Sequence, residues 1–139
     1  MGGEDRKITV INKSEGRSTL ELFLHHFQLK NSQIRAHVVI GDNQQGIKTV
    51  AGNVGAIGYV SIGTAEYEEA HDTPIHLLPM AGVPATAANV RDGRFPLSRP
   101  LNLVSKGLLT GLTKRFIAFA QSAAVDDLVT AHYFAPLAR

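Results

Sequence analysis

The sequence alternates between short apolar runs and helical patterns, and this alternation restricts the fold more than any other feature. Residues 7–11 form a β-branched run, and residues 18–29 then place apolar side chains at helical spacing. Further strands are predicted at residues 34–40, 55–61 and 73–79, and further helices after Asp42 and at residues 64–71. Strand–helix units at this spacing predict a three-layer α/β fold, with a mainly parallel sheet flanked by helices.

The pattern changes after residue 80. Glycine, proline and small residues predict a loop around a short helix at residues 86–91, and prolines in residues 96–104 predict an edge strand or a crossover. A turn at residues 107–111 precedes two predicted helices, the first beginning near Leu112 and the second covering residues 125–132. With no linker in between, we predict one domain over residues 1–139: an α/β lobe at about 7–104 and C-terminal helices at 105–139.

Composition excludes several classes of protein. With 44% apolar and 19% charged residues, a chain of 139 residues is long enough for one folded core. The net charge of +2 is scattered, so no nucleic-acid partner is expected. The absence of cysteine excludes disulfides and thiolate metal sites. No run approaches the ~18 apolar residues that a transmembrane helix needs.

The turn between the first strand and the first helix is the candidate binding site. A helix start leaves backbone N–H groups unsatisfied and carries partial positive charge. Cationic and hydroxyl side chains in the same turn add charge and donors, which predicts half of an anion cradle. The candidate oxyanion ligands are Lys13, Ser14, Gly16, Arg17, Ser18 and Thr19. As an alternative, Ser18 and Glu21 fit a capping box, which would stabilise the helix with no ligand.

A secondary contribution is expected from the next two loops. Asp42 can cap the second helix, and Gln45 occupies its capping-box position. Ligands of open α/β sheets lie outside the carboxyl ends of the strands, so Gln45, Gly46 and Tyr59 are candidate secondary contacts. The alternative for Tyr59 is a core tyrosine with its hydroxyl at the rim.

Catalytic and metal-binding patterns are absent from the sequence. His25 and His26 are adjacent on a predicted helix and point about 100° apart, so they cannot readily share a metal ion. No nucleophile elbow, phosphate loop of nucleotide-binding enzymes or dinucleotide fingerprint occurs. We therefore expect no metal site, no cofactor and no enzymatic activity.

Four runs occur in the order typical of one family. Residues 16–19 (Gly-Arg-Ser-Thr) precede Phe23, residues 55–60 read Gly-Ala-Ile-Gly-Tyr-Val, and residues 89–101 contain an Asn-Val…Pro-Leu-x-Arg-Pro-Leu signature. Residues 116–137 are similar to the family's closing helices. Together these runs resemble the phosphate-type substrate-binding proteins of ABC transporters, which have the type II periplasmic-binding-protein fold. The resemblance covers the second lobe and the C-terminal segment of that fold, and most of the first lobe is missing.

This resemblance implies the function. It predicts a solute-binding component of an ABC transporter that binds phosphate or a similar oxyanion outside the cytoplasm and delivers it to a permease. No apolar segment precedes the first strand, so no signal peptide is predicted, which leaves a cytoplasmic protein or a trimmed piece of an exported chain. The alternative is a sensory or protein-interaction domain that keeps the fold with a weak or lost anion site.

Two departures from the family pattern concern the same turn. Lys13 stands where the family often has arginine, and Arg17 stands where it has a small residue. Arg17 either supplies the bidentate fork that lysine lacks or fills the anion site. Because one lobe leaves the anion half exposed, the expected dissociation constant is on the order of a millimolar. The uncovered apolar surface predicts a homodimer or a partner that supplies the missing lobe.

Overall fold

A computed structural model describes residues 5–137, so the first four and last two residues of the predicted domain lie outside the described part. Its sheet has three parallel strands in the order β2-β1-β3. These strands are β1 (Thr9–Lys13), β2 (Val38–Ile40) and β3 (Ala56–Ile57). The pairing joins Ile11 to Val38 and Thr9 to Ala56.

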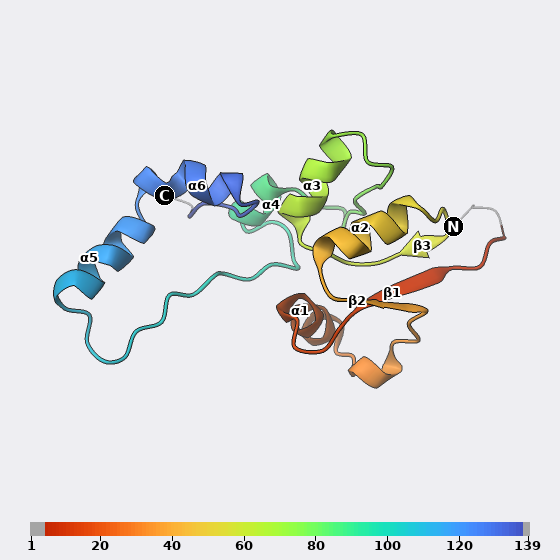
Figure 1. The fold of residues 1–139 in the computed structure, drawn as a ribbon, viewed down its shortest axis with the longest axis horizontal. Coiled ribbons are helices and arrows are strands. Elements are labelled where there is room, and N and C mark those ends of the chain that lie inside the picture. The colour runs from red at the N-terminus through yellow and green to blue at the C-terminus, as the bar shows by residue number, and fades with distance from the viewer. Residues whose placement is uncertain (1–4, 138–139) are drawn as a thin grey trace.

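Helices cover both sides of this sheet. Helix α1 (Ser18–Phe27) lies on one side, and α2 (Asn43–Ala51) and α3 (Ile62–Ala70) lie on the other (Figure 1). A short 3-10 helix, η1 (Asn31–Gln33), leads from α1 towards β2. The structure therefore confirms the predicted three-layer α/β fold with a parallel sheet.

The predicted start of the second helix is confirmed in part. Asp42 is its N-cap, and Asp42 Oδ1 accepts a hydrogen bond from the backbone N of Gln45 at 2.8 Å. The side chain of Gln45 accepts from the backbone N of Gly41 instead of completing a capping box on Asp42. Helix α4 (Ala87–Arg91) confirms the short helix predicted at residues 86–91, with Thr86 as its N-cap.

Three predicted strands are shorter than expected or missing. Residues 34–40 join the sheet only from Val38, and residues 55–61 contribute only Ala56–Ile57. The strand predicted at residues 73–79 is wrong. This segment hydrogen-bonds to helix α3 and not to a neighbouring strand. The backbone N of Leu77, for example, donates to Glu69 Oε1 at 3.1 Å. Residues 96–104 form no strand, which agrees with the crossover alternative (Figure 1).

The core is centred on β1. Ile11 in the central strand is only 2% exposed, and the flanking elements contribute further buried apolar side chains. The buried apolar residues are Ile11, Leu20, Ile40, Ile47, Ala65, Ala85 and Phe95. Because β1 lies between β2 and β3 with helices on either side, the core fixes the position of its carboxyl end and of the turn that follows.

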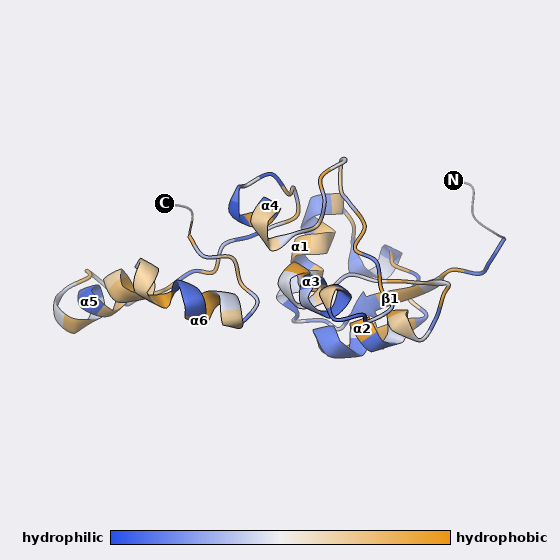
Figure 2. Ribbon diagram, turned by 90° about the horizontal axis from the view of Figure 1, so that it is seen from above, coloured by the Kyte–Doolittle hydropathy of each residue, from blue (hydrophilic) through white to orange (hydrophobic). Residues whose placement is uncertain are grey.

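The C-terminal part extends away from the sheet. Residues 96–110 lead to α5 (Gly111–Ala120), η2 (Ala123–Val125) and α6 (Asp126–Ala131), and both views place α5 far from the strands (Figures 1 and 2). Several apolar side chains here are exposed, among them Leu108 at 92% and Leu112 at 79%. We call residues 96–120 the arm. The division of the domain at residue 104 stays a prediction.

The chain returns to the lobe after α6. A Cβ atom added to Gly63 in α3 would lie 2.2 Å from the carbonyl oxygen of Tyr133, so only glycine permits this approach. Tyr133 therefore lies against α3, where its ring also meets that of Tyr67 with centroids 5.0 Å apart.

Candidate functional site

The three strands end at one edge of the sheet, and the polar residues of the site follow those ends. Strand β1 ends at Lys13, and its neighbour β2 ends at Ile40. The backbone N of Ser14 donates to the carbonyl of Ile40 at 2.9 Å, which continues the pairing of the two strands into the turn. Because parallel strands share this edge, the helix starts that follow them lie near one another.

Lys13 lies at this edge but is almost fully buried. The residue is 3% exposed, and its Nζ donates to Asn43 Oδ1 at 2.7 Å. Burial lowers the pKa of the Lys13 ammonium below its usual value; the negative charge of Asp42 opposes this effect, and the positive charge of Arg17 adds to it. The Lys13 ammonium therefore lies inside the protein, at the edge of the sheet where the candidate site begins.

The side-chain oxygen of Asn43 links the end of β1 to the start of α3. Asn43 Oδ1 accepts from Lys13 Nζ and from the backbone N of Ser61, the second bond being 3.3 Å long. Asn43 is the first residue of α2, and Ser61 is the N-cap of α3. One carboxamide thus joins the end of β1 to the starts of two helices.

The start of α1 has no side-chain cap. The N-cap is Arg17, with extended backbone, and helix α1 begins at Ser18. The predicted capping box of Ser18 and Glu21 is therefore wrong, because Ser18 lies inside the first turn instead of preceding it. Within residues 5–137, no hydrogen bond satisfies the backbone N–H groups of Ser18 and Thr19. These are two donors of the kind that a bound anion accepts from.

Arg17 reaches from this turn towards the start of α2. A Cβ atom added to Gly41 would lie 3.8 Å from Arg17 Nη2 and 3.5 Å from Gln45 Oε1. The Arg17 side chain is exposed. Gly16, just before it, has a φ of +76°, a left-handed conformation that favours glycine and turns the chain towards α1.

Neither cation of the turn is neutralised by a carboxylate. Among the described residues, Lys13 and Arg17 have no Asp or Glu oxygen within 4.0 Å. Asp42, the acidic residue that acts on Lys13, uses one carboxylate oxygen to cap α2. Two positive charges therefore remain beside an uncapped helix start.

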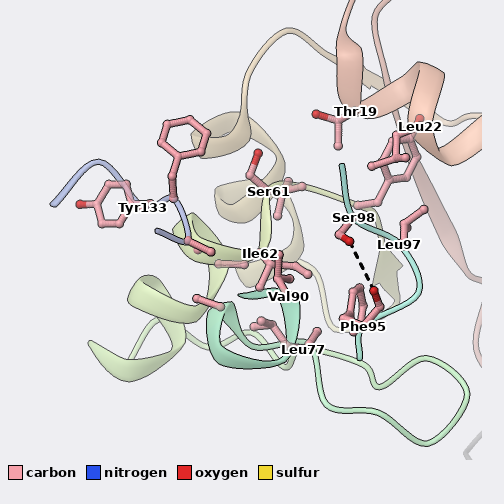
Figure 3. Close-up of a pocket in the computed structure, with 18 of the residues that line it drawn as sticks. Thr19, Leu22, Ser61, Ile62, Leu77, Val90, Phe95, Leu97, Ser98 and Tyr133 are labelled. Atoms are coloured by element: carbon pink, nitrogen blue, oxygen red, sulfur yellow. Dashed lines mark hydrogen bonds between the residues drawn. The ribbon is translucent and has the colours of Figure 1, made fainter. Parts of the chain in front are cut away.

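An open, mainly apolar cavity of about 1500 Å³ borders this edge. Its lining includes Ser18 and Thr19 from α1, Tyr59 after β3, and Ser61 before α3. Figure 3 shows Thr19 and Ser61 entering the cavity from separate elements, with Ser98 bonded to the carbonyl of Phe95 at its side. An anion at the start of α1 would have this open space on one side.

Tyr59 braces the turn through its hydroxyl. That hydroxyl donates to Asn12 Oδ1 and accepts from the backbone N of Lys13 at 3.4 Å, and burial raises its pKa. The ring stacks on Phe23 with centroids 4.1 Å apart. Both hydrogen-bonding directions of the hydroxyl are used within the protein, so Tyr59 supports the site and offers no free donor.

Gln45 and Gly46, the other candidate secondary contacts, are also engaged. The backbone N of Gln45 is bonded to Asp42, and its side-chain oxygen is bonded to Gly41. Gly46 is buried, and a Cβ atom there would lie 2.6 Å from Ile40 Cδ1. Both residues therefore serve the packing of α2 against β2.

Sequence reasoning missed Asn43 and Ser61. A signal exists for Ser61, since serine is a preferred N-cap and a helical run follows it, but the apolar run of residues 55–61 predicts a strand at this position. Asn43 had no distinct signal beyond its place after Asp42.

Within residues 5–137, no group of three or more histidine, aspartate or glutamate side chains could hold a metal ion. None of the helices in these residues is long and apolar enough to cross a bilayer.

Comparison with known proteins assigns the class. The family described as the PBP superfamily domain matches residues 1–124, and the chain belongs to that family. The predicted resemblance to phosphate-type substrate-binding proteins is confirmed at this level, because the phosphate-binding protein PstS of Bacillus subtilis is 27% identical over 138 residues. A PstS 2 protein of Streptococcus pneumoniae is 35% identical over 97 residues, or 69% of this chain and 31% of that protein.

Solved structures agree with this assignment. A phosphate-binding protein of a phosphate ABC transporter from Streptococcus pneumoniae has a TM-score of 0.71 and 28% identity, covering 91% of this chain and 50% of that one. A phosphate ABC transporter substrate-binding protein from Clostridium perfringens, with bound phosphate, has a TM-score of 0.73 and 29% identity over 98% of this chain and 54% of that one. The alignment to the Bacillus protein covers 99% of this chain but 44% of that relative, so the chain spans about half of its relatives' length.

Proposed function

We propose that this chain binds inorganic phosphate or a similar oxyanion at the start of α1, as a solute-binding component of an ABC transporter. The observation that carries the proposal is the pair of cations, Lys13 and Arg17, without carboxylate partners among the described residues and beside an uncapped helix start. The names of the relatives, which are phosphate-binding proteins, support the choice of phosphate.

The residues of the turn have distinct roles in this proposal. Backbone and hydroxyl groups donate to the anion, and the exposed guanidinium of Arg17 offers it a bidentate fork. The donating residues are Ser14, Gly16, Ser18 and Thr19. Lys13 acts through its charge and not as a donor to the anion, because its ammonium is buried and bonded to Asn43.

The open cavity beside the turn limits the affinity. Water competes for both the anion and its donors where one side of the site is exposed, and charge-assisted hydrogen bonds then lose much of their net value. We expect a dissociation constant for phosphate on the order of a millimolar. Tight binding by a monomer would contradict this half-site account.

Substituting Thr19→Ala is expected to weaken phosphate binding by about 1 kcal/mol or more, because a hydroxyl that donates to a charged ligand is lost. Isothermal titration with phosphate measures the change. Thr49→Ala is the matched control, because Thr49 lies in α2 and its hydroxyl is bonded to the carbonyl of Gln45. An unchanged affinity in Thr19→Ala would remove this hydroxyl from the site.

The transport context is part of the same proposal. Since the relatives are binding proteins of phosphate ABC transporters, we propose an extracytoplasmic location and an ABC permease as a partner. The role is that of a binding protein and not of an enzyme. Permease genes beside the gene for this chain would support import, and their absence would favour the alternative role below.

A protein partner is expected to cover the cavity and the arm. Exposed apolar side chains follow one another along the arm, among them Val104, Leu108 and Leu112, and apolar surface of this kind is typical of an interface. The candidates are a second copy of this chain and a chain that supplies the missing lobe. Light scattering on the purified protein is expected to show a dimer, and a clean monomer at high concentration would contradict self-association.

The alternative function is a sensory or interaction domain that keeps the fold. The open cavity favours it, because transport requires a ligand that is held firmly enough to be delivered. In that case Arg17 would occupy the anion position itself. A crystal grown with phosphate distinguishes the two, since an anion at residues 16–19 supports binding and an Arg17 guanidinium folded into that place supports the alternative.

A further inference from the structure

Asn43 lies at the centre of the site without belonging to the turn that would hold the anion. We propose that Asn43 is a positioning residue, which holds the buried Lys13 ammonium with a neutral acceptor so that the lysine's charge acts on the bound anion. This inference rests on the proposed anion site. It adds a requirement on a residue of α2, outside the turn that would hold the anion.

The geometry gives Asn43 this role. Lys13 is 3% exposed, and Asn43 Oδ1 accepts from its Nζ at 2.7 Å. A buried ammonium is ordinarily paired with a carboxylate, because an isolated charge is costly to remove from water. Here the acceptor carries no charge, so the hydrogen bond satisfies a donor of the ammonium and leaves its positive charge intact.

The charged groups around Lys13 are consistent with this role. Asp42 and Arg17 are the groups whose charges act on the ammonium, and they act in opposite directions. The Asp42 carboxylate caps α2 and is not within ion-pair distance of Lys13. The Tyr59 hydroxyl meets the backbone of Lys13 and not its side chain. Within residues 5–137, the Lys13 ammonium therefore has no carboxylate within 4.0 Å, and its hydrogen-bonded side-chain partner is the neutral Asn43.

The second hydrogen bond of Asn43 decides which substitution can test this role. Its Oδ1 also accepts from the backbone N of Ser61, which fixes the start of α3. An aspartate at position 43 has the same shape and keeps an acceptor oxygen for both donors. Asn43→Asp therefore changes the charge beside Lys13 and leaves the hydrogen bonds of the loops in place.

The test is a phosphate titration of Asn43→Asp. A carboxylate on the ammonium is expected to cancel its charge and to weaken phosphate binding at least about tenfold. Asn53→Asp is the matched control. Asn53 lies at the opposite end of β1, where its Nδ2 donates to Thr9 Oγ1 and its Oδ1 accepts from the backbone N of Gly55. Since distant exposed charges are screened, the control is expected to stay within about twofold of the wild type.

A second measurement separates electrostatics from structure. The Lys13 side chain is titrated by NMR, and its pKa is expected to rise in Asn43→Asp and to stay unchanged in Asn53→Asp. If the wild type binds phosphate and Asn43→Asp binds it equally well, the inference is overturned and the proposed function stands. If the wild type shows no phosphate binding, the proposed function fails and the inference fails with it.

Discussion

Arg17→Glu is expected to reduce phosphate binding by about a hundredfold, which places it beyond detection for a site of millimolar affinity. The substitution removes a guanidinium without a carboxylate partner in the described chain and puts a negative charge where the anion binds. Arg17→Ala, which only removes the donor, is expected to cost about tenfold. Phosphate titration followed by NMR measures both variants.

Arg35→Glu controls for the change in net charge. Arg35 is exposed and precedes β2, so it lies towards the opposite end of the strands from the candidate turn. Its reversal is expected to leave phosphate binding within about twofold, because exposed charges beyond a Debye length are screened. Arg17→Ala that binds phosphate more tightly than the wild type would show that Arg17 blocks the site.

Ile11→Ala is expected to have the largest effect on stability. Ile11 is 2% exposed in the central strand, and truncating a buried isoleucine costs about 2–5 kcal/mol in lost burial and cavity formation. That is a large part of the 5–15 kcal/mol that stabilises a typical domain. Urea denaturation followed by circular dichroism measures the change in the free energy of unfolding.

Ile8→Ala is the control for this substitution. Ile8 precedes the same strand but is 61% exposed, so the same truncation is expected to change the free energy of unfolding by less than about 0.5 kcal/mol. Equal effects of the two substitutions would show that β1 is not the centre of the core.

The layers of the fold were predictable because each element carries its own periodicity. Residues 7–11 and 18–29 show strand and helix patterns that local side-chain chemistry enforces, and β1 and α1 form there. The prediction of a strand at residues 73–79 was wrong, because Ile75 and Leu77 lie in a loop. The backbone N of Leu77 donates to the side chain of Glu69 and not to a neighbouring strand. Such a side-chain acceptor comes from tertiary structure and leaves no local pattern.

The turn that carries the candidate site was predictable from the sequence, but the hydrogen bonds around Lys13 were not. The strand was expected to end at residue 11, but β1 continues to Lys13. Alternate residues of a strand face the same side, so Lys13 shares the buried side with Ile11 and meets Asn43 there. A lysine expected to reach the anion is instead held inside. Its partner lies thirty positions away along the chain, at a distance that periodicity does not reveal.

A phosphate titration of the ¹⁵N-labelled chain, read amide by amide, tests the central claim most directly. If the anion binds at the start of α1, the amide signals of Arg17, Ser18 and Thr19 are expected to shift and to saturate with a dissociation constant of about a millimolar, while chloride at equal ionic strength has no such effect. Shifts confined to other residues, or none at these three amides up to tens of millimolar phosphate, would contradict the account.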